Sequence, residues 1–75
     1  MKNVNAEISI HEILTRREIE ITKLIAKSYT DKQIAHKLFR SYHTIRTHHK
    51  NILNKTGQHS IGGLICFAMQ KGLKI

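Results

Sequence analysis

The sequence predicts a compact all-α domain built from four short helices. Proline is absent and glycine occurs only four times among the 75 residues, which favours helices over turn-rich β-structure. Helix-capping residues and apolar residues at helical spacing recur along the chain, separated by links of a few residues. A chain of this length forms one small domain with a modest core, and we expect it to lack a wing.

Residues 1–11 show no sustained periodicity and are predicted to be a lead-in or linker to a domain over residues 12–73. The first helix is expected from about residue 16 to 27. It begins with a capping box, in which the Thr15 hydroxyl accepts from the Glu18 amide and the Glu18 carboxylate reaches back. The residues expected in its core face are Ile19, Ile21, Leu24 and Ile25.

A second capping box, formed by Thr30 and Gln33, starts the next helix, which should span residues 31–38. Asp31 in its first turn suits the positive end of the helix dipole. The apolar residues that this helix should bury are Ile34, Ala35 and Leu38.

The third helix should span residues 42–55, with Ser41 as its N-cap after the tight link Phe39-Arg40. Gly57 can take the left-handed conformation that ends a helix. A fourth helix is predicted over residues 61–71, capped by Ser60 and closed by Gly72. Its apolar residues are Ile61, Leu64, Ile65, Ala68 and Met69.

The third helix presents three different faces when its residues are placed at about 100° per residue. The predicted buried stripe contains Ile45, His49, Ile52 and Thr56, flanked by Tyr42, Leu53 and His48. The opposite face carries the hydrogen-bonding side chains of His43, Arg46, Thr47, Lys50 and Asn54. A polar strip along one edge contains Thr44, Asn51 and Lys55.

The charge distribution favours a polyanionic partner. The net charge is +8, and residues 29–75 carry eight basic side chains against Asp31 alone, a net +7. Residues 1–28 carry a net charge of only +1. A one-sided positive field attracts polyanions, whereas a surface that is merely solvated usually intersperses both signs.

A short helix, a tight turn and a helix with such a polar face form a helix-turn-helix, here about residues 29–48. In this motif the second helix enters the major groove of double-stranded DNA. Arg46 and Lys50 suit guanine or phosphate, and Thr47 can contact a thymine methyl group. His43 points with this base-reading face. Phosphate contacts are expected at helix starts and on the polar edge, from Thr30, Lys32, Ser41, Thr44 and Lys55.

Other site chemistries fit the sequence poorly. The third helix carries His43, His48 and His49, which lack the i, i+4 spacing of a helical metal site, so we expect no metal and no cofactor. A pH switch stays open because imidazoles titrate near neutrality. No set of nucleophile, base and acid can be assembled, and there is no glycine-rich phosphate loop, so we expect no enzyme.

Membrane contact is not expected, because no apolar run approaches the roughly 20 residues of a membrane span. No apolar block follows the N-terminus, which argues against a signal peptide. The single cysteine, Cys66, cannot form an internal disulfide and stands among apolar residues. We therefore expect a buried thiol in a cytosolic protein.

A distributed pattern covers nearly the whole of residues 12–73. It consists of Leu14-Thr15, Arg17-Glu18, Leu24-Ile25-Ala26, Lys32, Ile34-Ala35, Leu38, Ser41, Thr44-Ile45-Arg46, His48, Asn51-Ile52, Lys55 and Gly57. This pattern resembles that of the LuxR-type helix-turn-helix domain, the C-terminal DNA-binding domain of many bacterial transcription regulators.

The resemblance implies a four-helix fold whose third helix reads the major groove and whose fourth helix often mediates dimerisation on DNA. It implies base or groove contacts from Arg46, Thr47 and Lys50, and adds Asn51 to the phosphate contacts. It also implies that His48, more than His49, is the structural histidine. The chain departs from the family at several positions. Ser28 replaces a usual glycine, Thr22 and Thr56 replace usual leucines, and Arg40 replaces an aliphatic residue.

The expected function is therefore sequence-specific binding of double-stranded DNA by a bacterial transcription regulator, or by a response-regulator effector domain. The expected partners are double-stranded DNA, RNA polymerase, and a second copy that binds through Ile61, Leu64, Ile65 and Ala68. That apolar stripe can equally complete the core of a monomer. Two alternatives come from other classes: a helical protein-interaction module of the transcription machinery (sigma-like or polymerase-contacting), and a metal-dependent nuclease that uses the histidines.

Overall fold

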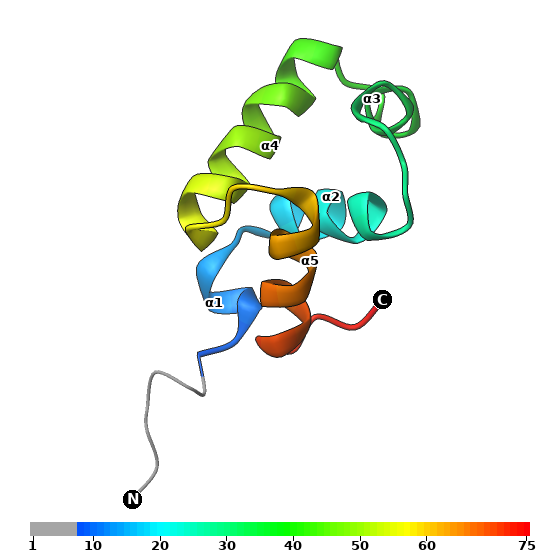
Figure 1. Cartoon of the computed structure of the whole chain (residues 1–75). Coiled ribbons are helices and arrows are strands. Elements are labelled where there is room, and N and C mark those ends of the chain that lie inside the picture. The colour runs from blue at the N-terminus through cyan, green and yellow to red at the C-terminus, as the bar shows by residue number, and fades with distance from the viewer. Residues whose placement is uncertain (1–7) are drawn as a thin grey trace, which may run out of the picture.

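The computed structural model describes residues 8–75, which fold into five α-helices joined by short links (Figure 1). The helices are α1 (Ile10–Ile13), α2 (Arg16–Ala26), α3 (Asp31–Leu38), α4 (Tyr42–Thr56) and α5 (Ile61–Gln70). Residues 8–75 contain no strand, and the predicted all-α class is confirmed. The four predicted helices correspond to α2 through α5, and no end differs from its prediction by more than one residue.

The short helix α1 was not predicted, and it includes residues 10 and 11 of the expected lead-in. Ser9 caps it: the Ser9 side chain accepts from the His11 amide, and the Glu12 carboxylate accepts from the Ser9 amide at 2.9 Å. Ile10 is fully buried, and its amide donates to the Lys71 carbonyl oxygen at 2.8 Å. The folded unit therefore starts before residue 12, while residues 1–7 of the expected lead-in lie outside the described residues.

Both predicted capping boxes are present. At the start of α2, the Glu18 amide donates to the Thr15 hydroxyl at 3.1 Å and the Thr15 amide donates to the Glu18 carboxylate at 2.8 Å. At the start of α3, the equivalent bonds join Thr30 and Gln33 at 3.2 and 2.8 Å. Each box satisfies two groups that a helix start otherwise leaves unpaired, so these helix starts are fixed by local sequence alone.

Helix α2 ends in a Schellman motif. The Tyr29 amide donates to the Leu24 carbonyl oxygen at 3.0 Å, and the Ser28 amide donates to the Ile25 carbonyl oxygen at 2.9 Å. Ser28 takes the left-handed conformation with φ 69°, at a position where a glycine is usual in the family. A side chain in this region costs roughly 1–2 kcal/mol, so the link from α2 to α3 is held against local preference.

The ends of α3, α4 and α5 also have a residue with positive φ. Gly57 after α4 has φ 70°, as predicted, and Gly72 after α5 has φ 98°. Phe39, which follows α3, is left-handed with φ 55°, and its side chain is almost wholly exposed. The tight turn of the helix-turn-helix is therefore made by a non-glycine residue whose ring contributes little to the core.

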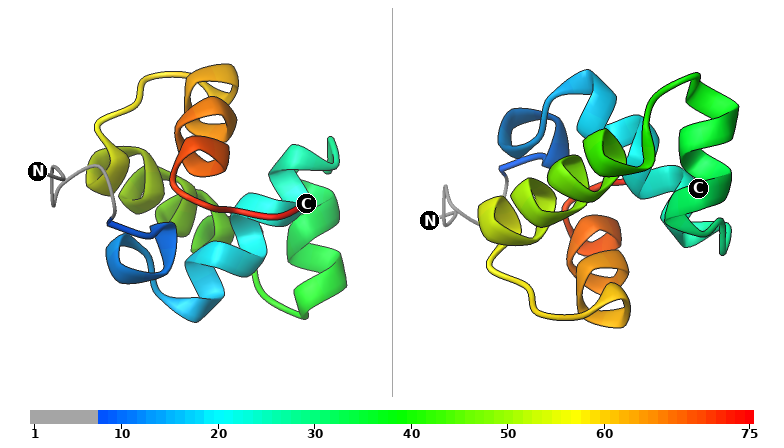
Figure 2. Two further views of the ribbon diagram at one scale, coloured as in Figure 1. Left: turned by 90° about the horizontal axis from the view of Figure 1, so that it is seen from below. Right: turned by 90° about the horizontal axis from the view of Figure 1, so that it is seen from above.

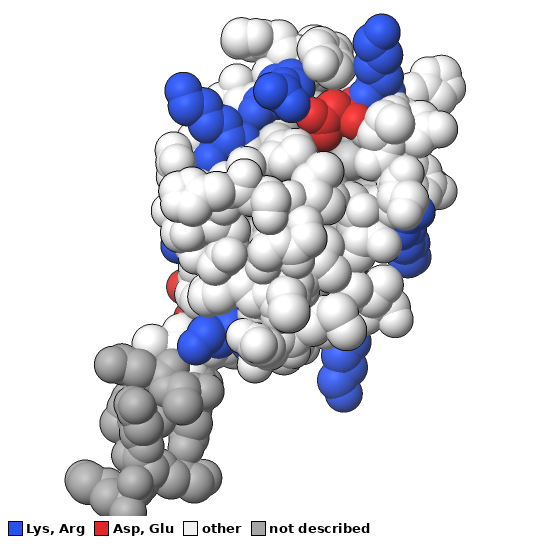
Figure 3. All heavy atoms as spheres, in the orientation of Figure 1, with Lys and Arg blue, Asp and Glu red and all other residues white. Residues whose placement is uncertain are grey.

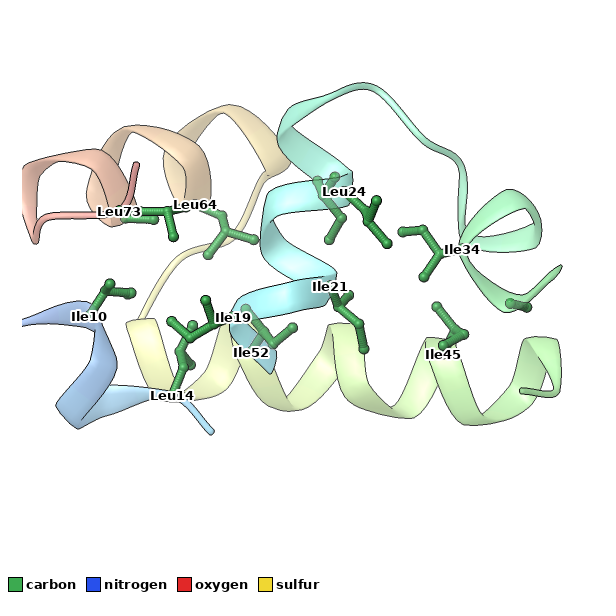
Figure 4. Close-up of a cluster of buried hydrophobic side chains, with 13 residues drawn as sticks. Ile10, Leu14, Ile19, Ile21, Leu24, Ile34, Ile45, Ile52, Leu64 and Leu73 are labelled. Atoms are coloured by element: carbon green, nitrogen blue, oxygen red, sulfur yellow. The ribbon is translucent and has the colours of Figure 1, made fainter. Parts of the chain in front are cut away.

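The core has two parts (Figure 4). In the first, Ile21 of α2, Ile34 of α3 and Ile45 of α4 point toward one another, and all three are fully buried. The second part joins α1, α2, α4, α5 and the C-terminal segment, and its labelled side chains are Ile10, Leu14, Ile19, Ile52, Leu64 and Leu73. The first part fixes α3 against α4 and so sets the geometry of the helix-turn-helix.

The two threonines that replace usual leucines are both buried. The Thr22 hydroxyl donates to the Glu18 carbonyl oxygen and the Thr56 hydroxyl to the Ile52 carbonyl oxygen, each at 2.8 Å. Each hydroxyl is thus satisfied within its own helix, which removes most of the penalty for burying it.

Helix α4 contacts α2, α3 and α5, and seen from above it lies in front of α2 with its outward side uncovered (Figure 2, right). This arrangement leaves the polar side of the longest helix open to a partner.

Candidate nucleic-acid interface

The outward side of α4 carries the predicted base-reading residues. His43, Arg46, Thr47 and Lys50 are all exposed. They line one surface groove that continues past the C-terminal end of the helix and also includes Asn54, Gln58 and His59. Because His43 and Lys50 are seven residues apart on one helix, the face spans about two turns, or roughly 10 Å. That length suits contact with several successive base edges.

Arg46 is joined to the helix before it. Its Nη1 atom donates to Oδ2 of Asp31 at 3.0 Å, so the first turn of α3 is linked to the base-reading face of α4. The hydrogen bond from Arg46 to Asp31 raises the pKa of the guanidinium further above its ordinary value, and the guanidinium stays charged at any pH of interest. The sequence around Asp31 indicated only its role at the helix dipole and gave no sign of this contact with Arg46.

His49 is the buried histidine of α4, and it shares the same acid. Its Nδ1 atom lies 3.2 Å from Oδ1 of Asp31. An ionised carboxylate can only accept hydrogen bonds, so this contact requires a proton on Nδ1. His48 is only half-buried. The helical spacing left the choice between the two histidines open, and the resemblance favoured His48. The buried histidine that contacts Asp31 is instead His49, which lies in line with Ile45 and Ile52.

The predicted phosphate-contacting residues lie at the starts of α3 and α4 and along one edge of α4. Thr30, Lys32, Ser41 and Asn51 are exposed, and Thr44 is half-buried. The Ser41 hydroxyl accepts from the Thr44 amide at 3.0 Å and donates to the Thr44 hydroxyl at 2.9 Å. The Thr44 hydroxyl hydrogen is left available for an acceptor outside the helix.

Lys55 differs from the other predicted phosphate contacts because it is paired. Its Nζ atom donates to Oε1 of Glu18 at 2.9 Å, which ties the C-terminal end of α4 to the start of α2. Burial raises the pKa of the Glu18 carboxyl, but hydrogen bonds from Lys55 and Thr15 outweigh this and hold the pKa below its ordinary value of 4.5. Glu18 therefore both caps α2 and fixes the position of α4, and only the first of these roles was predictable from the sequence.

Charge is arranged unevenly over α3 and α4. Figure 3 shows Lys and Arg side chains on this part of the surface, with one acidic patch among them. Asp31, which accepts a hydrogen bond from Arg46, is the only acid in residues 29–75. The field over the helix-turn-helix is positive apart from this one carboxylate.

Helix α5 divides the four predicted dimer-interface residues into two groups. Leu64 and Ala68 are fully buried in the core of the monomer and cannot contact a second copy, because they already pack within the second part of the core. Ile61 is exposed and Ile65 is partly buried. Cys66 is exposed, which corrects the predicted buried thiol: it stands two residues, about 200° of helix, from both Leu64 and Ala68.

A metal site with three protein ligands and a membrane-spanning helix are both absent from residues 8–75. No group of three or more His, Cys, Asp or Glu side chains in this part of the chain is placed to hold a metal ion. None of its helices is long and apolar enough to cross a membrane.

Comparison with known proteins places the chain in a family. Residues 12–68 match the family described as bacterial regulatory proteins, luxR family. The chain is 45% identical over 62 residues to the oxygen regulatory protein NreC of Staphylococcus aureus strain JH9, covering 83% of this chain and 29% of NreC. NreC of strain USA300 is equally similar.

Among solved structures, the response regulator ChrA of a heme-sensing two-component system matches with a TM-score of 0.77 and 36% identity. The match covers 81% of this chain and 30% of ChrA. The chain thus spans less than a third of the length of NreC and ChrA. The match over residues 12–68, together with the helix-turn-helix of α3 and α4, shows that this chain belongs to the luxR family of bacterial regulatory proteins and is a LuxR-type DNA-binding domain.

Proposed function

We propose that the chain binds double-stranded DNA sequence-specifically, with α4 as the recognition helix in the major groove. The observation that carries this proposal is the outward side of α4, where Arg46, Thr47 and Lys50 line one groove in a region of net charge +7. A helix-turn-helix presents its second helix to DNA in this way. Non-specific affinity comes from the positive field, and base contacts add the preference for one sequence.

The residues divide by the atoms they can reach. Arg46 and Lys50 donate to the O6 and N7 acceptors of guanine, Thr47 contacts a thymine methyl group, and His43 stands at the N-terminal edge of the same face. Thr30, Lys32, Ser41, Thr44 and Asn51 contact phosphates and fix the orientation on the duplex. Lys55 has further N–H donors for a phosphate, but only in a geometry that keeps its bond to Glu18.

The lengths of the relatives support a larger assembly. NreC and ChrA are about three times as long as the part that this chain matches, and ChrA is a response regulator. We place the chain as the effector domain of a regulator of this kind in the bacterial cytoplasm, acting without catalysis and in contact with RNA polymerase. A second copy would bind on DNA through the part of α5 that remains accessible, Ile61 and Ile65.

Selection of duplexes from a random pool tests the proposal. It is repeated at about 50 and about 200 mM salt, a range over which phosphate contacts weaken strongly. Recovery of one sequence motif at both salt concentrations supports the proposal, and two copies of the motif in inverted orientation support a dimer. Absence of enrichment at both concentrations contradicts sequence-specific binding.

A further inference from the structure

The carboxylate of Asp31 stands in a place where an acid should be unfavourable. It is the only acid in residues 29–75, and it lies between α3 and α4, the two helices that face the DNA phosphates in the proposed complex. A carboxylate close to phosphates repels them and weakens binding to every sequence. This acid therefore needs a role that offsets its general effect on affinity.

The contacts of Asp31 indicate that role. Oδ2 accepts from Nη1 of Arg46 at 3.0 Å, and Oδ1 accepts from Nδ1 of His49 at 3.2 Å. The side chains of Asp31 and His49 are only 13% and 11% exposed, whereas that of Arg46 is 58% exposed. The acid is thus largely buried and is held by a buried histidine, while the arginine that it contacts stays exposed.

An arginine held in this way is prepared for base reading. The guanidinium is planar and has five N–H donors, and a hydrogen bond from Nη1 to Asp31 restrains the plane while the other edge stays free. A free arginine must give up its rotamer freedom when it binds a base, whereas a restrained one has already done so. Binding to a non-matching base pair is also less favourable, because the restrained guanidinium cannot reorient toward other acceptors.

We propose that Asp31 is a positioning residue that fixes Arg46 for base recognition, and that His49 in turn fixes Asp31. This inference rests on the proposed function, because it assumes that Arg46 reads a base. A purely structural ion pair is the competing explanation. Such a pair would change the stability of the fold and leave the ratio of affinities for different duplexes unchanged.

The test compares Asp31→Ala with Glu20→Ala. Both substitutions remove one negative charge, but Glu20 is an exposed residue of α2 that pairs with Arg17 at 3.1 Å. Binding is measured on the duplex selected by the unaltered protein, on a duplex altered at the base pair that Arg46→Ala identifies, and on random duplex. Thermal unfolding of each variant shows whether the fold is kept.

Two quantities are expected to change differently: the ratio of affinities for the selected and altered duplexes, and the affinity for random duplex. Asp31→Ala should reduce the ratio of affinities for the selected and altered duplexes about tenfold, as expected when one bidentate base contact is weakened. Affinity for random duplex should stay the same or rise about threefold at low salt, because a repulsive charge is removed. Glu20→Ala should leave the ratio unchanged. An unchanged ratio in Asp31→Ala overturns the inference, and so does an equal loss on all three duplexes.

A double substitution shows whether Asp31 acts through Arg46. If it does, adding Asp31→Ala to Arg46→Ala lowers the ratio no further, because the residue that it positions is already gone. A further tenfold loss in the double variant would mean that Asp31 acts elsewhere, which overturns the inference. Failure of the proposed function is distinct, since the unaltered protein would then select no sequence from the pool.

Discussion

Near its N-terminal end α4 is tied to α3 by Asp31, and near its C-terminal end it is tied to α2 by Glu18. Each contact is an ion pair between helices: Asp31 pairs with Arg46 at 3.0 Å, and Glu18 pairs with Lys55 at 2.9 Å. The surroundings differ. Glu18 also completes the capping box of α2 through Thr15, whereas Asp31 contacts only side chains of α4, among them Arg46 on the outward face.

The difference shows that the position of an ion pair relative to the partner surface decides what it does. The Glu18 carboxylate is almost fully buried and accepts from the Thr15 backbone and from Lys55, so its removal leaves several groups without a partner. The Asp31 pair involves an exposed arginine on the proposed DNA face. We expect the first pair to control stability and the second to control base preference.

The largest effect is expected from Ile52→Ala, which opens a cavity in the second part of the core, where α4 packs against α2 and α5. Ile52 is fully buried, and a truncation of this kind costs about 2–5 kcal/mol. In a domain of this size such a loss is a large fraction of the total stability, so urea denaturation followed by circular dichroism should show an early or absent transition. A midpoint within experimental error of the unaltered protein would contradict the described packing.

Arg46→Ala tests the ion pair near the N-terminal end of α4 separately from the other pair. It should relax the preference at one base position by about 1–3 kcal/mol and leave stability almost unchanged, because the side chain is exposed. Lys32→Ala, in contrast, should weaken binding to all duplexes alike. Titration of specific and random duplexes with both variants checks the division of roles. Equal losses of both variants on both duplexes would show that the assigned roles are wrong.

Glu18→Gln tests the ion pair near the C-terminal end of α4 separately from the first pair. It should reduce stability by about 1–2 kcal/mol near neutral pH, because the capping and Lys55 bonds lose their ionic character. The selected DNA sequence should not change. Denaturation and pool selection with the same variant measure the two effects, and Glu20→Gln on the exposed side of α2 is the matched control. A changed base preference in Glu18→Gln would remove the distinction between the two ends.

The same residue gives a pH dependence with a defined sign. The pKa of Glu18 is lower in the folded state than its ordinary value of 4.5, despite the opposing effect of burial. The unfolded chain therefore binds more protons in acid, so stability is fully present above 4.5 and is lost as the pH falls through the folded pKa. Glu18→Gln should flatten this part of the stability profile. A loss of the same steepness in the variant would assign the acid dependence to other groups.

The smallest effect is expected from Ser28→Gly, in the link between the helices that carry the two acids. Relief of the left-handed serine should increase stability by up to about 1 kcal/mol, reduced by the greater backbone entropy of glycine in the unfolded chain. Thermal unfolding measures the change, and Gly57→Ala, at φ 70°, should move stability in the opposite direction. Destabilisation by Ser28→Gly would indicate that the serine side chain has a favourable role.

The predictable parts of the site were those set by a helix alone. Helical spacing placed His43, Arg46, Thr47 and Lys50 outward, and all four are exposed. It also placed His49 in the buried stripe, where the resemblance to the family pointed to His48 instead. The partners of the two acidic side chains were harder to predict, because Asp31 and Glu18 are 15 and 37 residues from the basic side chains that they contact. No local pattern links residues at such separations.

Missed elements in the fold have a similar cause. Helix α1 has only four residues, too few to show an apolar period, although its capping box at Ser9 and Glu12 was a usable signal. The apolar stripe of α5 was compatible with a core or with a dimer interface. Packing against α2 and α4 decided in favour of the core for Leu64 and Ala68.

The sequence by itself determined where α2 to α5 begin and end, because caps, left-handed glycine and apolar period act over a few neighbouring residues. It also determined the sign of the field over α3 and α4, since residues 29–75 carry a single acid. Only the tertiary structure decided which basic side chain pairs with each acidic side chain. It also decided that the Ile10 amide donates to the Lys71 carbonyl oxygen, beyond the end of α5. Those contacts depend on how helices distant in sequence pack together, and packing depends on the shapes of all the side chains at once.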